Sequence, residues 1–383
     1  MEKVKLYELA DIYLGVTHTP EYVFDGVPFL SVKDISGGKI CFDDCKYISQ
    51  EEYDSLSEGA KPKVGDMLFC RVGTLGKPII IPEGTPLFGS FVSLGYLRNK
   101  NADRCDLNYL RYWMYSNSFW KQVNSNVKGA SQVNLNTGWL SKFDIDLPEM
   151  QEQKYRISVL DKCKVIIEQR EEELKVLDDL IKARFVELFG DPSTNPKGYP
   201  VKVLPEIAEY WNGLTYRPED VSDEGTIVLR SSNIQNATLD FADTVRVSCK
   251  IGDKKYVQDN DILMCSRNGS ARLVGKVALI KDIEEPMSFG AFMMIIRSEY
   301  YPYLMTYFQM PAFRAQITTG ATTTINQITG RMLDIVKLPV PDMDVINEFA
   351  DFVHQVDKSK AAVQKSLDET QQLFDSLMQQ YFG

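Results

Sequence analysis

The feature of this sequence that most constrains its fold is a helical segment that occurs twice. The segment from Leu180 to Gly190 returns, in related form, from Leu373 to Gly383. A Leu-Pro pair precedes each copy, at residues 147–148 and again at 338–339, and each pair follows a block of mixed, strand-rich sequence. The chain is therefore predicted to be a tandem duplication with an α+β fold, in which each half is one globular block followed by one long helix.

Short motifs inside the two globular blocks also repeat in the same order. Each motif is a short apolar strand or a Gly-led turn that runs into polar residues. This alignment matches Cys70 with Cys265 and the Arg71 loop with the Arg267 loop. The offset between partners drifts between roughly 190 and 200 residues, which places the length changes in loops, where insertions are tolerated. The motif pairs are 29–35 with 228–234, 65–73 with 260–269, 89–91 with 290–292, and 129–134 with 320–326.

The composition fits two domains of ordinary size. A chain of 383 residues is long enough to form two cores. The net charge is −10, and residues 340–383 carry half of it, with 3 Lys+Arg against 8 Asp+Glu. Because neutralisation of phosphates drives most non-specific affinity for nucleic acids, any DNA-binding face is expected to be local or shared with a basic partner.

The seven cysteines are scattered along the chain. Cys41 and Cys45 have no second pair that would complete a zinc site, so no metal site is predicted. Cys70 and Cys265 lie in apolar strands, which favours buried thiols in a reducing compartment over disulfides. No apolar run approaches the ~20 residues of a membrane span, and the first residues lack a signal-peptide core. A cytoplasmic protein is predicted.

The two helical segments have the periodicity of a coiled coil. Apolar residues recur every seven positions between residues 149 and 190, and again between 342 and 383. A second apolar stripe on the later segment suits a helix that has more than one neighbour. A helix of about 40 residues is roughly 60 Å long, so each helix is predicted to act as a spacer. The predicted seam residues are Leu160, Ile167, Leu174, Leu177, Ile181, Leu188, Val353, Val356, Val363, Leu367, Phe374 and Leu377.

The sequence contains no recognisable catalytic constellation. Its only histidines are His18 and His354, and His354 lies inside the predicted C-terminal helix, so no Ser-His-Asp or Cys-His pairing has a plausible partner in both halves. The Gly-rich segment 269–276 has the wrong spacing for a phosphate-binding loop. Glu173 and Lys175 have the spacing of a nuclease motif but lie on the predicted coiled coil. Neither a catalytic residue nor a cofactor of its own is therefore predicted for this chain.

Loops of both blocks are rich in hydrogen-bond donors. Arg, Lys, Asn and Gln side chains can pair with base edges, while Ser and Thr hydroxyls suit phosphates. A single residue of this kind is usually ordinary loop surface, but the recurrence of the set in both repeats predicts two DNA-binding loop clusters. The candidate DNA-binding residues are Ser31, Lys33, Arg71, Thr74, Lys77, Lys128, Ser131, Gln132, Asn134, Asn136, Arg217, Arg230, Ser232, Asn233, Arg267, Asn268, Ser270, Arg272, Thr322, Thr323, Asn326 and Gln327.

Residues 147–162 contain, in order, the elements Leu-Pro, Glu-Gln, Arg-Ile and Leu-Asp. A Gly-x-x-Gln element precedes them at 129–132, and a helix end follows at 180–192. This arrangement resembles the specificity subunit of type I restriction-modification systems, over essentially the full chain. The second copy departs from the family's pattern, with Val345-Ile346 where Glu-Gln is expected.

The resemblance implies a role for each segment. Residues 1–147 and 191–339 would be target recognition domains that each read one half of a bipartite sequence in double-stranded DNA. Residues 148–190 and 340–383 would be conserved helices that pair antiparallel, as a spacer and as a docking surface for two methyltransferase subunits. A restriction endonuclease and translocase subunit would join for cleavage. S-adenosylmethionine, ATP and magnesium would be bound by these partners, and the chain itself would be non-catalytic.

Two other classes of function stay open. One is a self-contained DNA-modifying enzyme, and the other is a coiled-coil scaffold with no role on DNA. For the DNA-recognition hypothesis, the loops around Arg71 and Arg267 differ in length and composition, so an asymmetric target is predicted.

Overall fold

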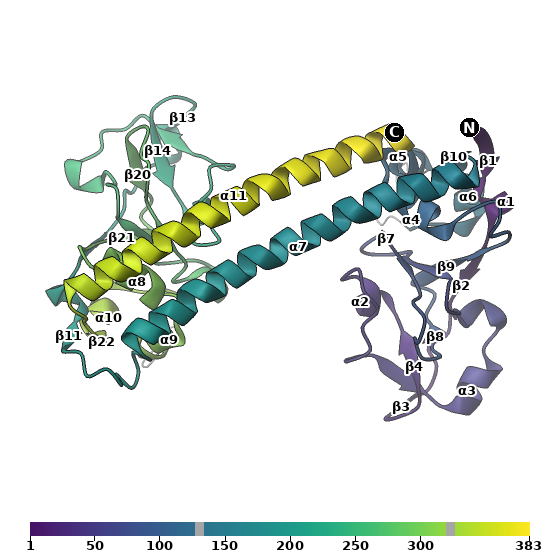
Figure 1. The fold of residues 1–383 in the computed structure, drawn as a ribbon, viewed down its shortest axis with the longest axis horizontal. Helices are drawn as coiled ribbons and strands as arrows, with labels where there is room; N and C mark the ends of the chain where they lie inside the picture. The colour runs from purple at the N-terminus through teal and green to yellow at the C-terminus, as the bar shows by residue number, and fades with distance from the viewer. Residues whose placement is uncertain (127–133, 319–325) are drawn as a thin grey trace. The chain divides into compact units, whose positions relative to one another are not determined.

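The computed structural model describes residues 1–126, 134–318 and 326–383, and its elements form two similar sets (Figure 1). The first set consists of β1 (Glu2–Lys5), α1 (Leu6–Leu9), β2 (Ala10–Leu14), β3 (Tyr22–Val23), β4 (Val27–Leu30), α2 (Val32–Ile35), β5 (Lys46–Ile48), α3 (Gln50–Ser55), β6 (Met67–Cys70), β7 (Gly76–Ile80), β8 (Gly89–Ser90), β9 (Leu94–Asn99), α4 (Leu107–Tyr115), α5 (Asn117–Asn126), α6 (Thr137–Leu140), β10 (Asp144–Leu147) and α7 (Met150–Phe189). The second set consists of β11 (Val201–Val203), β12 (Glu209–Asn212), β13 (Val221–Ser222), β14 (Thr226–Leu229), β15 (Ile234–Gln235), β16 (Thr238–Leu239), β17 (Arg246–Val247), β18 (Ile262–Cys265), β19 (Val277–Leu279), β20 (Met287–Phe289), β21 (Met293–Arg297), α8 (Tyr301–Tyr307), α9 (Pro311–Thr318), α10 (Gly330–Asp334), β22 (Lys337–Pro339) and α11 (Met343–Phe382). Each half is thus a strand-rich block followed by one long helix, as predicted.

The sheets of the two sets have the same strand orders. The first set forms the pair β1-β10 and the four-stranded sheets β2-β9-β6-β7 and β3-β5-β4-β8. The second set forms β11-β22, β12-β21-β18-β19 and β13-β17-β14-β20, with a small hairpin β15-β16 added. The parallel pair β4-β8 of the first half returns as the parallel pair β14-β20. This agreement confirms the tandem duplication.

The chain divides into two compact units, and each unit combines one globular block with parts of both long helices. Unit 1 comprises Met1–Glu171 and Lys365–Gly383, and unit 2 comprises Glu172–Gln364. In unit 1 the ring of Tyr109 packs 4.9 Å from that of Phe382, at the end of α11. In unit 2 the rings of Tyr303 and Phe189, at the end of α7, lie 5.0 Å apart. The last turn of each helix therefore completes the core of the block that the other half of the sequence encodes.

The long helices run antiparallel within each unit. In unit 1 the first part of α7 lies beside the last part of α11 (Figure 1). In unit 2 Asp178 of α7 pairs with Lys360 of α11 at 2.6 Å, and further along α7 Arg184 pairs with Glu348. Each seam residue predicted from the seven-residue pattern is buried or half-buried. The pairing of the two long helices therefore agrees with the seven-residue apolar repeat in their sequences.

The loops around Arg71 and Arg267 correspond, as the match of Cys70 with Cys265 predicts, but the two arginines lie one residue apart in the register. Isolated bridges place Val72 opposite Asn134 in the first half and Arg267 opposite Gln327 in the second. Val72 therefore corresponds to Arg267. Both loops contain one arginine near the strand end, and only strand pairing distinguishes the two positions.

The predicted pairing of Gly89 with Gly290 is wrong by two residues. The bridges join Val16 to Phe91 and Leu214 to Gly290, and the parallel strand pairs give the same correspondence. Phe91 therefore corresponds to Gly290. A glycine followed by a small and an aromatic residue is too short a motif to set a register, whereas hydrogen-bonded strands set it strictly.

Close backbone packing requires glycine at two equivalent positions, Gly15 and Gly213. A Cβ atom at Gly15 would lie 2.1 Å from the Ser90 oxygen, and one at Gly213 would lie 2.1 Å from the Phe289 oxygen. We expect either Gly→Ala change to lower the free energy of unfolding by about 1–3 kcal/mol, because paired backbone cannot move aside easily. Urea denaturation measures the loss. Among the described residues nothing lies within 4 Å of a Cβ at Gly252, so Gly252→Ala is the control, and equal losses at Gly213 and Gly252 would contradict the packing.

The cysteines are free thiols. All seven lack a disulfide partner, and Cys70 and Cys265 are buried in their strands, as predicted. Within the part of the chain that the structure describes, no cluster of three or more His, Cys, Asp or Glu side chains is arranged to hold a metal. In that same part, no helix is long and apolar enough to cross a bilayer.

Candidate nucleic-acid interface

Three loops of unit 2 meet at one end of the sheet β12-β21-β18-β19. They are the loop 266–276 after β18, the turn 290–292 between β20 and β21, and the segment 326–329 before α10. The Phe292 oxygen accepts hydrogen bonds from the backbone N–H groups of Ser266 at 2.9 Å and Arg267 at 3.1 Å. The Ile328 N–H donates to the Ser266 oxygen at 2.7 Å. Main-chain hydrogen bonds thus fix the three loops to one another, and we call them the unit 2 loop cluster.

Unit 1 holds a matching unit 1 loop cluster. It consists of the loop 71–75 after β6, the turn 91–93 between β8 and β9, and the segment 134–136 before α6. The Arg71 N–H donates to the Ser93 oxygen, and the Leu135 N–H donates to the Arg71 oxygen, both at 2.9 Å. The duplication therefore extends to the hydrogen bonds of the loops.

The arginines of the two clusters have opposite environments. The Arg71 guanidinium donates to the Leu135 oxygen at 3.0 Å and to the Val92 oxygen at 3.1 Å, so it holds the loops of unit 1 together. Arg267 is exposed, and its guanidinium carbon lies 5.2 Å from the centre of the Phe292 ring. The contrast follows from the one-residue shift, since successive residues of an extended chain point to opposite sides.

A second polar turn follows β4 and β14. Ser31 is the N-cap of α2, and its N–H and hydroxyl donate to the Asp34 carboxylate at 2.7 and 2.9 Å. Arg230, at the corresponding place in unit 2, is half-buried and pairs with Asp243 at 2.7 Å. Asn233 is 1% exposed, and its amide donates to two backbone oxygens of the loop that follows. The Asn233 side chain therefore serves the domain's own structure.

The other candidate residues divide by exposure. Those that are exposed are Lys33, Thr74, Asn134, Asn136, Arg217, Arg272 and Asn326. Those that are half-buried are Lys77, Ser232, Asn268, Ser270 and Gln327. Outside the described residues lie Lys128, Ser131, Gln132, Thr322 and Thr323. The structure brings Asn268 and Asn326 together in the unit 2 loop cluster, where the Asn268 N–H donates to the Asn326 oxygen, whereas Arg217 pairs with Glu219.

A buried ion pair in each block was missed by the sequence reasoning. Asp66 is 4% exposed and accepts hydrogen bonds from Arg98 at 3.0 and 2.7 Å and from the Lys63 N–H at 2.8 Å. Asp261 is 1% exposed and accepts two hydrogen bonds from Arg297, both at 2.7 Å. Each pair joins neighbouring strands, and donation to the carboxylate is the main cause that raises the pKa of both arginines. The sequence feature that could have indicated the ion pair is an Asp directly before the corresponding strand in both repeats.

The two equivalent cysteines lie next to the loop clusters but are not reactive groups. Burial raises the pKa of the Cys70 thiol to about 11 and also raises the pKa of Cys265. Since the thiolate is the nucleophilic form, thiols that stay protonated at neutral pH are not poised for covalent chemistry.

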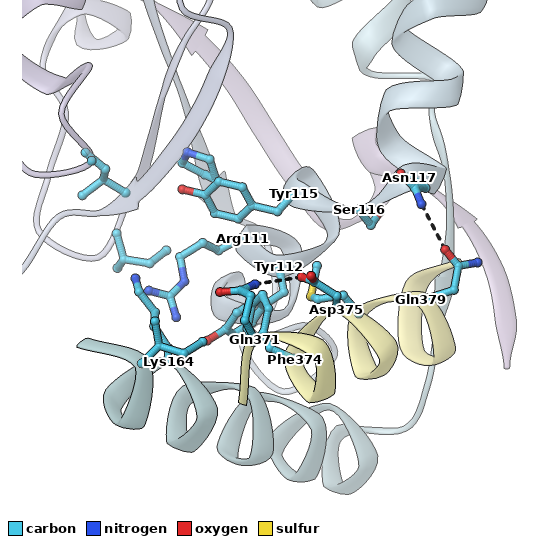
Figure 2. A pocket seen from close by; sticks show the side chains of 16 residues that line it. Arg111, Tyr112, Tyr115, Ser116, Asn117, Lys164, Gln371, Phe374, Asp375 and Gln379 are labelled. Carbon is cyan, nitrogen blue, oxygen red and sulfur yellow. Dashed lines mark hydrogen bonds between the residues drawn. The ribbon is translucent and has the colours of Figure 1, made fainter. Parts of the chain in front are cut away.

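A cavity of about 570 Å³ lies in unit 1 between the globular block and the long helices (Figure 2). Residues of β7, α4 and α5 line one side, and residues of α7 and α11 line the other. Asn117 donates to Gln379 at 3.0 Å, and Gln371 donates to Asp375 at 2.9 Å, as Figure 2 shows. Arg111 pairs with an aspartate of α7 at 2.9 Å. The wall of the cavity is thus partly polar and partly apolar, and the polar side chains described above are paired with other groups of the protein.

The Glu-Gln element of α7 has a structural role. Gln153 is 0% exposed, and its amide donates to the Arg104 and Pro148 oxygens, both at 2.9 Å. Its own oxygen accepts from the Asp106 N–H at 2.9 Å. The corresponding residue of α11 is Ile346, which is also 0% exposed and lies in the apolar core of unit 2. Where the second copy departs from the family's Glu-Gln pattern, an apolar contact of Ile346 therefore replaces the hydrogen bonds of Gln153.

Comparison with known proteins relates both the sequence and the fold to one group. Residues 1–176 match the model of the family described as Type I restriction modification DNA specificity domain. The chain is 28% identical over 183 residues to the type I restriction enzyme StySPI specificity subunit of Salmonella potsdam, and 27% identical over 179 residues to the EcoKI specificity subunit of Escherichia coli strain K12. These alignments cover 44% and 43% of this chain and 39% and 38% of the relatives. The chain thus spans about two fifths of the length of the curated relatives it matches.

Solved structures resemble the fold over the full chain. The type I restriction-modification S subunit from M. genitalium is 14% identical, with a TM-score of 0.58 and coverage of 100% of this chain and 96% of that chain. A chain from a structure on complex assembly and conformational transition of the type I R-M system is 16% identical, with a TM-score of 0.60 and coverage of 100% and 97%. At these identities the likeness concerns the fold.

The fold defines the class of this protein, which is a duplicated two-domain protein with paired long helices, like the solved specificity subunits. Residues 1–176 thus resemble the type I restriction-modification DNA specificity domain, and the first part of the chain is similar in sequence to curated specificity subunits.

Proposed function

We propose that this chain selects the DNA target of a type I restriction-modification enzyme. Residues 1–147 and 191–339 act as target recognition domains, and each reads one half of an asymmetric bipartite sequence. Residues 148–190 and 340–383 act as a spacer and as a docking surface for two methyltransferase subunits. Adenine methylation and DNA cleavage, with S-adenosylmethionine, ATP and magnesium, belong to the methyltransferase subunits and to a restriction subunit.

The observation that carries this proposal is one loop cluster, built twice, in a chain whose two long helices run antiparallel. Duplicated domains on antiparallel helices suit two half-sites of a duplex. Helices of 40 residues are long and stiff enough to set a constant length of unread DNA between half-sites. The clusters carry different side chains at corresponding positions, Val72 in unit 1 and Arg267 in unit 2, which supports an asymmetric target.

The proposed DNA contacts are the donors of the two loop clusters and their surroundings that reach the surface. In unit 1 they are Thr74, Lys77, Asn134 and Asn136, and in unit 2 they are Arg267, Ser270, Arg272, Asn326 and Gln327. Arg71, Asn233 and Asn268 are left out of this set, because hydrogen bonds inside the domain engage their side chains.

Exposed apolar side chains support the docking of protein partners on the long helices. Val165 and Val176 of α7 are 50% and 57% exposed, and Leu373 of α11 is 52% exposed. These side chains would lose their contact with water if a protein partner bound the helices, which would favour docking. One of the similar solved structures concerns complex assembly of a type I R-M system, which favours the same role here.

We expect cells that contain this chain and its methyltransferase to methylate adenines in one asymmetric, bipartite sequence with a spacer of constant length. Sequencing of methylated genomic DNA measures both half-sites and the spacer together. Cells with the methyltransferase but without this chain are the control. A palindromic target would contradict the asymmetry, and methylation that does not depend on this chain would contradict the proposed function.

The two alternative functions make different predictions for the purified chain. Turnover on DNA by the chain alone, with S-adenosylmethionine or magnesium, would favour a self-contained enzyme. Failure to bind the mapped target even with methyltransferase subunits present would favour a scaffold.

A further inference from the structure

We propose that Arg267 and Phe292 of unit 2 together form a preoriented reader of one guanine in the half-site of this unit. This inference rests on the proposed DNA-recognition function and adds to it the base and the residues that recognise it. The corresponding positions of unit 1 hold Val72 and Ser93, neither of which can make a paired contact to guanine. The reader is therefore specific to one half of the target.

The aromatic half of the reader is Phe292, whose side chain is 59% exposed. It lies in a tight turn that is closed by a hydrogen bond from the Met293 N–H to the Gly290 oxygen at 2.8 Å. The Phe292 oxygen accepts three hydrogen bonds, from the N–H groups of Ser266 and Arg267 and from the Ser266 hydroxyl at 2.9 Å. An exposed ring on so firmly held a turn is a fixed platform.

The guanidinium of Arg267 is positioned by this platform, with 5.2 Å between its central carbon and the ring centre. Among the described residues it donates to no acceptor, so its N–H groups are available to a ligand. Its neighbour Asn268 is engaged inside the cluster, because its side chain accepts from the Ser270 N–H at 3.0 Å and donates to the Ser231 hydroxyl at 3.1 Å. Arg267 is thus the outward-facing donor of a braced loop.

The chemistry of the pair selects guanine. An arginine presents two parallel N–H donors that match the O6 and N7 acceptors of guanine in the major groove, whereas adenine presents a donor at one of those positions. Contact with an aromatic face holds the long side chain in one orientation, so less side-chain entropy is lost when the base is bound. A lysine in this place would supply charge without the planar pair of donors.

The test uses the complex of this chain with its methyltransferase subunits and duplexes that carry the mapped target. Each base pair of both half-sites is replaced in turn, and initial methylation rates are compared. For the wild-type chain, replacing one G·C pair in the unit 2 half-site is expected to lower the rate roughly 10- to 100-fold. Arg267→Ala is expected to abolish this discrimination at that pair alone, whereas Arg267→Lys and Phe292→Ala are each expected to reduce it. Val72→Ala, at the corresponding place in unit 1, is the matched control and should leave every ratio unchanged.

The outcomes separate this inference from the proposed function. Absence of a chain-dependent bipartite target for the wild-type complex would overturn both. A wild-type target that Arg267→Ala reads with undiminished discrimination at every G·C pair would overturn the reader alone. An equal loss of rate on all duplexes would also overturn it, because Arg267 would then be a phosphate contact. Unchanged thermal unfolding of Arg267→Ala is expected, since the side chain is exposed.

Discussion

Replacement of Phe185 by alanine is expected to lower the free energy of unfolding by about 3–5 kcal/mol. Phe185 is 0% exposed and packs with three other rings, at 4.8 Å from Phe189, 5.2 Å from Tyr303 and 5.7 Å from Phe349. These rings join α7, α8 and α11, so truncation would leave a cavity where both long helices meet the block of unit 2. Urea unfolding followed by circular dichroism measures the loss.

The matched control for Phe185→Ala is Leu180→Ala on the same helix. Leu180 is 44% exposed, and its truncation is expected to change the free energy of unfolding by about 0.5 kcal/mol or less. A loss at Phe185 that is no larger than the loss at Leu180 would show that the aromatic cluster does not hold the helix end in place.

Removal of the Asp261 carboxylate is expected to lower the free energy of unfolding by about 3–5 kcal/mol. Asp261→Ala would leave the Arg297 guanidinium without its two acceptors and the Gln258 N–H without the carboxylate oxygen that it reaches at 2.8 Å. Since the half-buried Arg297 guanidinium loses the buried carboxylate that accepts two of its hydrogen bonds, the cost exceeds that of an ordinary surface pair. Asp66→Ala is expected to have an effect of the same size in unit 1.

Two variants control for the loss of charge and of shape. Glu284→Ala removes an exposed carboxylate of unit 2 and is expected to shift the free energy of unfolding by about 0.5 kcal/mol or less. Asp261→Asn keeps the shape and one acceptor, so an intermediate loss is expected. A shift below about 1 kcal/mol for Asp261→Ala would mean that strand packing, not the ion pair, holds this edge of the sheet.

The sequence predicted the architecture well because the signals for it are local. The apolar repeat along residues 149–189 and its return near the end of the chain predict two long helices, and α7 and α11 cover those segments. Repeated Asp-led apolar strands predict equivalent sheets, which the matching strand orders confirm. Periodicity and short motifs depend only on neighbouring residues, so they can be read without a structure.

The sequence was less reliable for the site. It matched the Arg71 loop with the Arg267 loop, but it did not show that the two arginines lie one residue apart in the register of the strand bridges. It also included Asn233, whose amide is used inside the domain. Phe292 counted only as part of the repeated motif 290–292, because its 59% exposure depends on the turn that holds it.

By itself, the sequence determined the duplication, the two helices and the strand-rich character of each block, because backbone periodicity and hydrophobic patterning are properties of short stretches. Only the tertiary structure decided which residues of the two halves correspond, and hence that Arg71 points inward to the Val92 oxygen while Arg267 points outward over Phe292. It also decided that each long helix ends in the core of the block encoded by the other half. Both outcomes depend on pairing between residues far apart in the chain, where a shift of one position reverses the direction of a side chain.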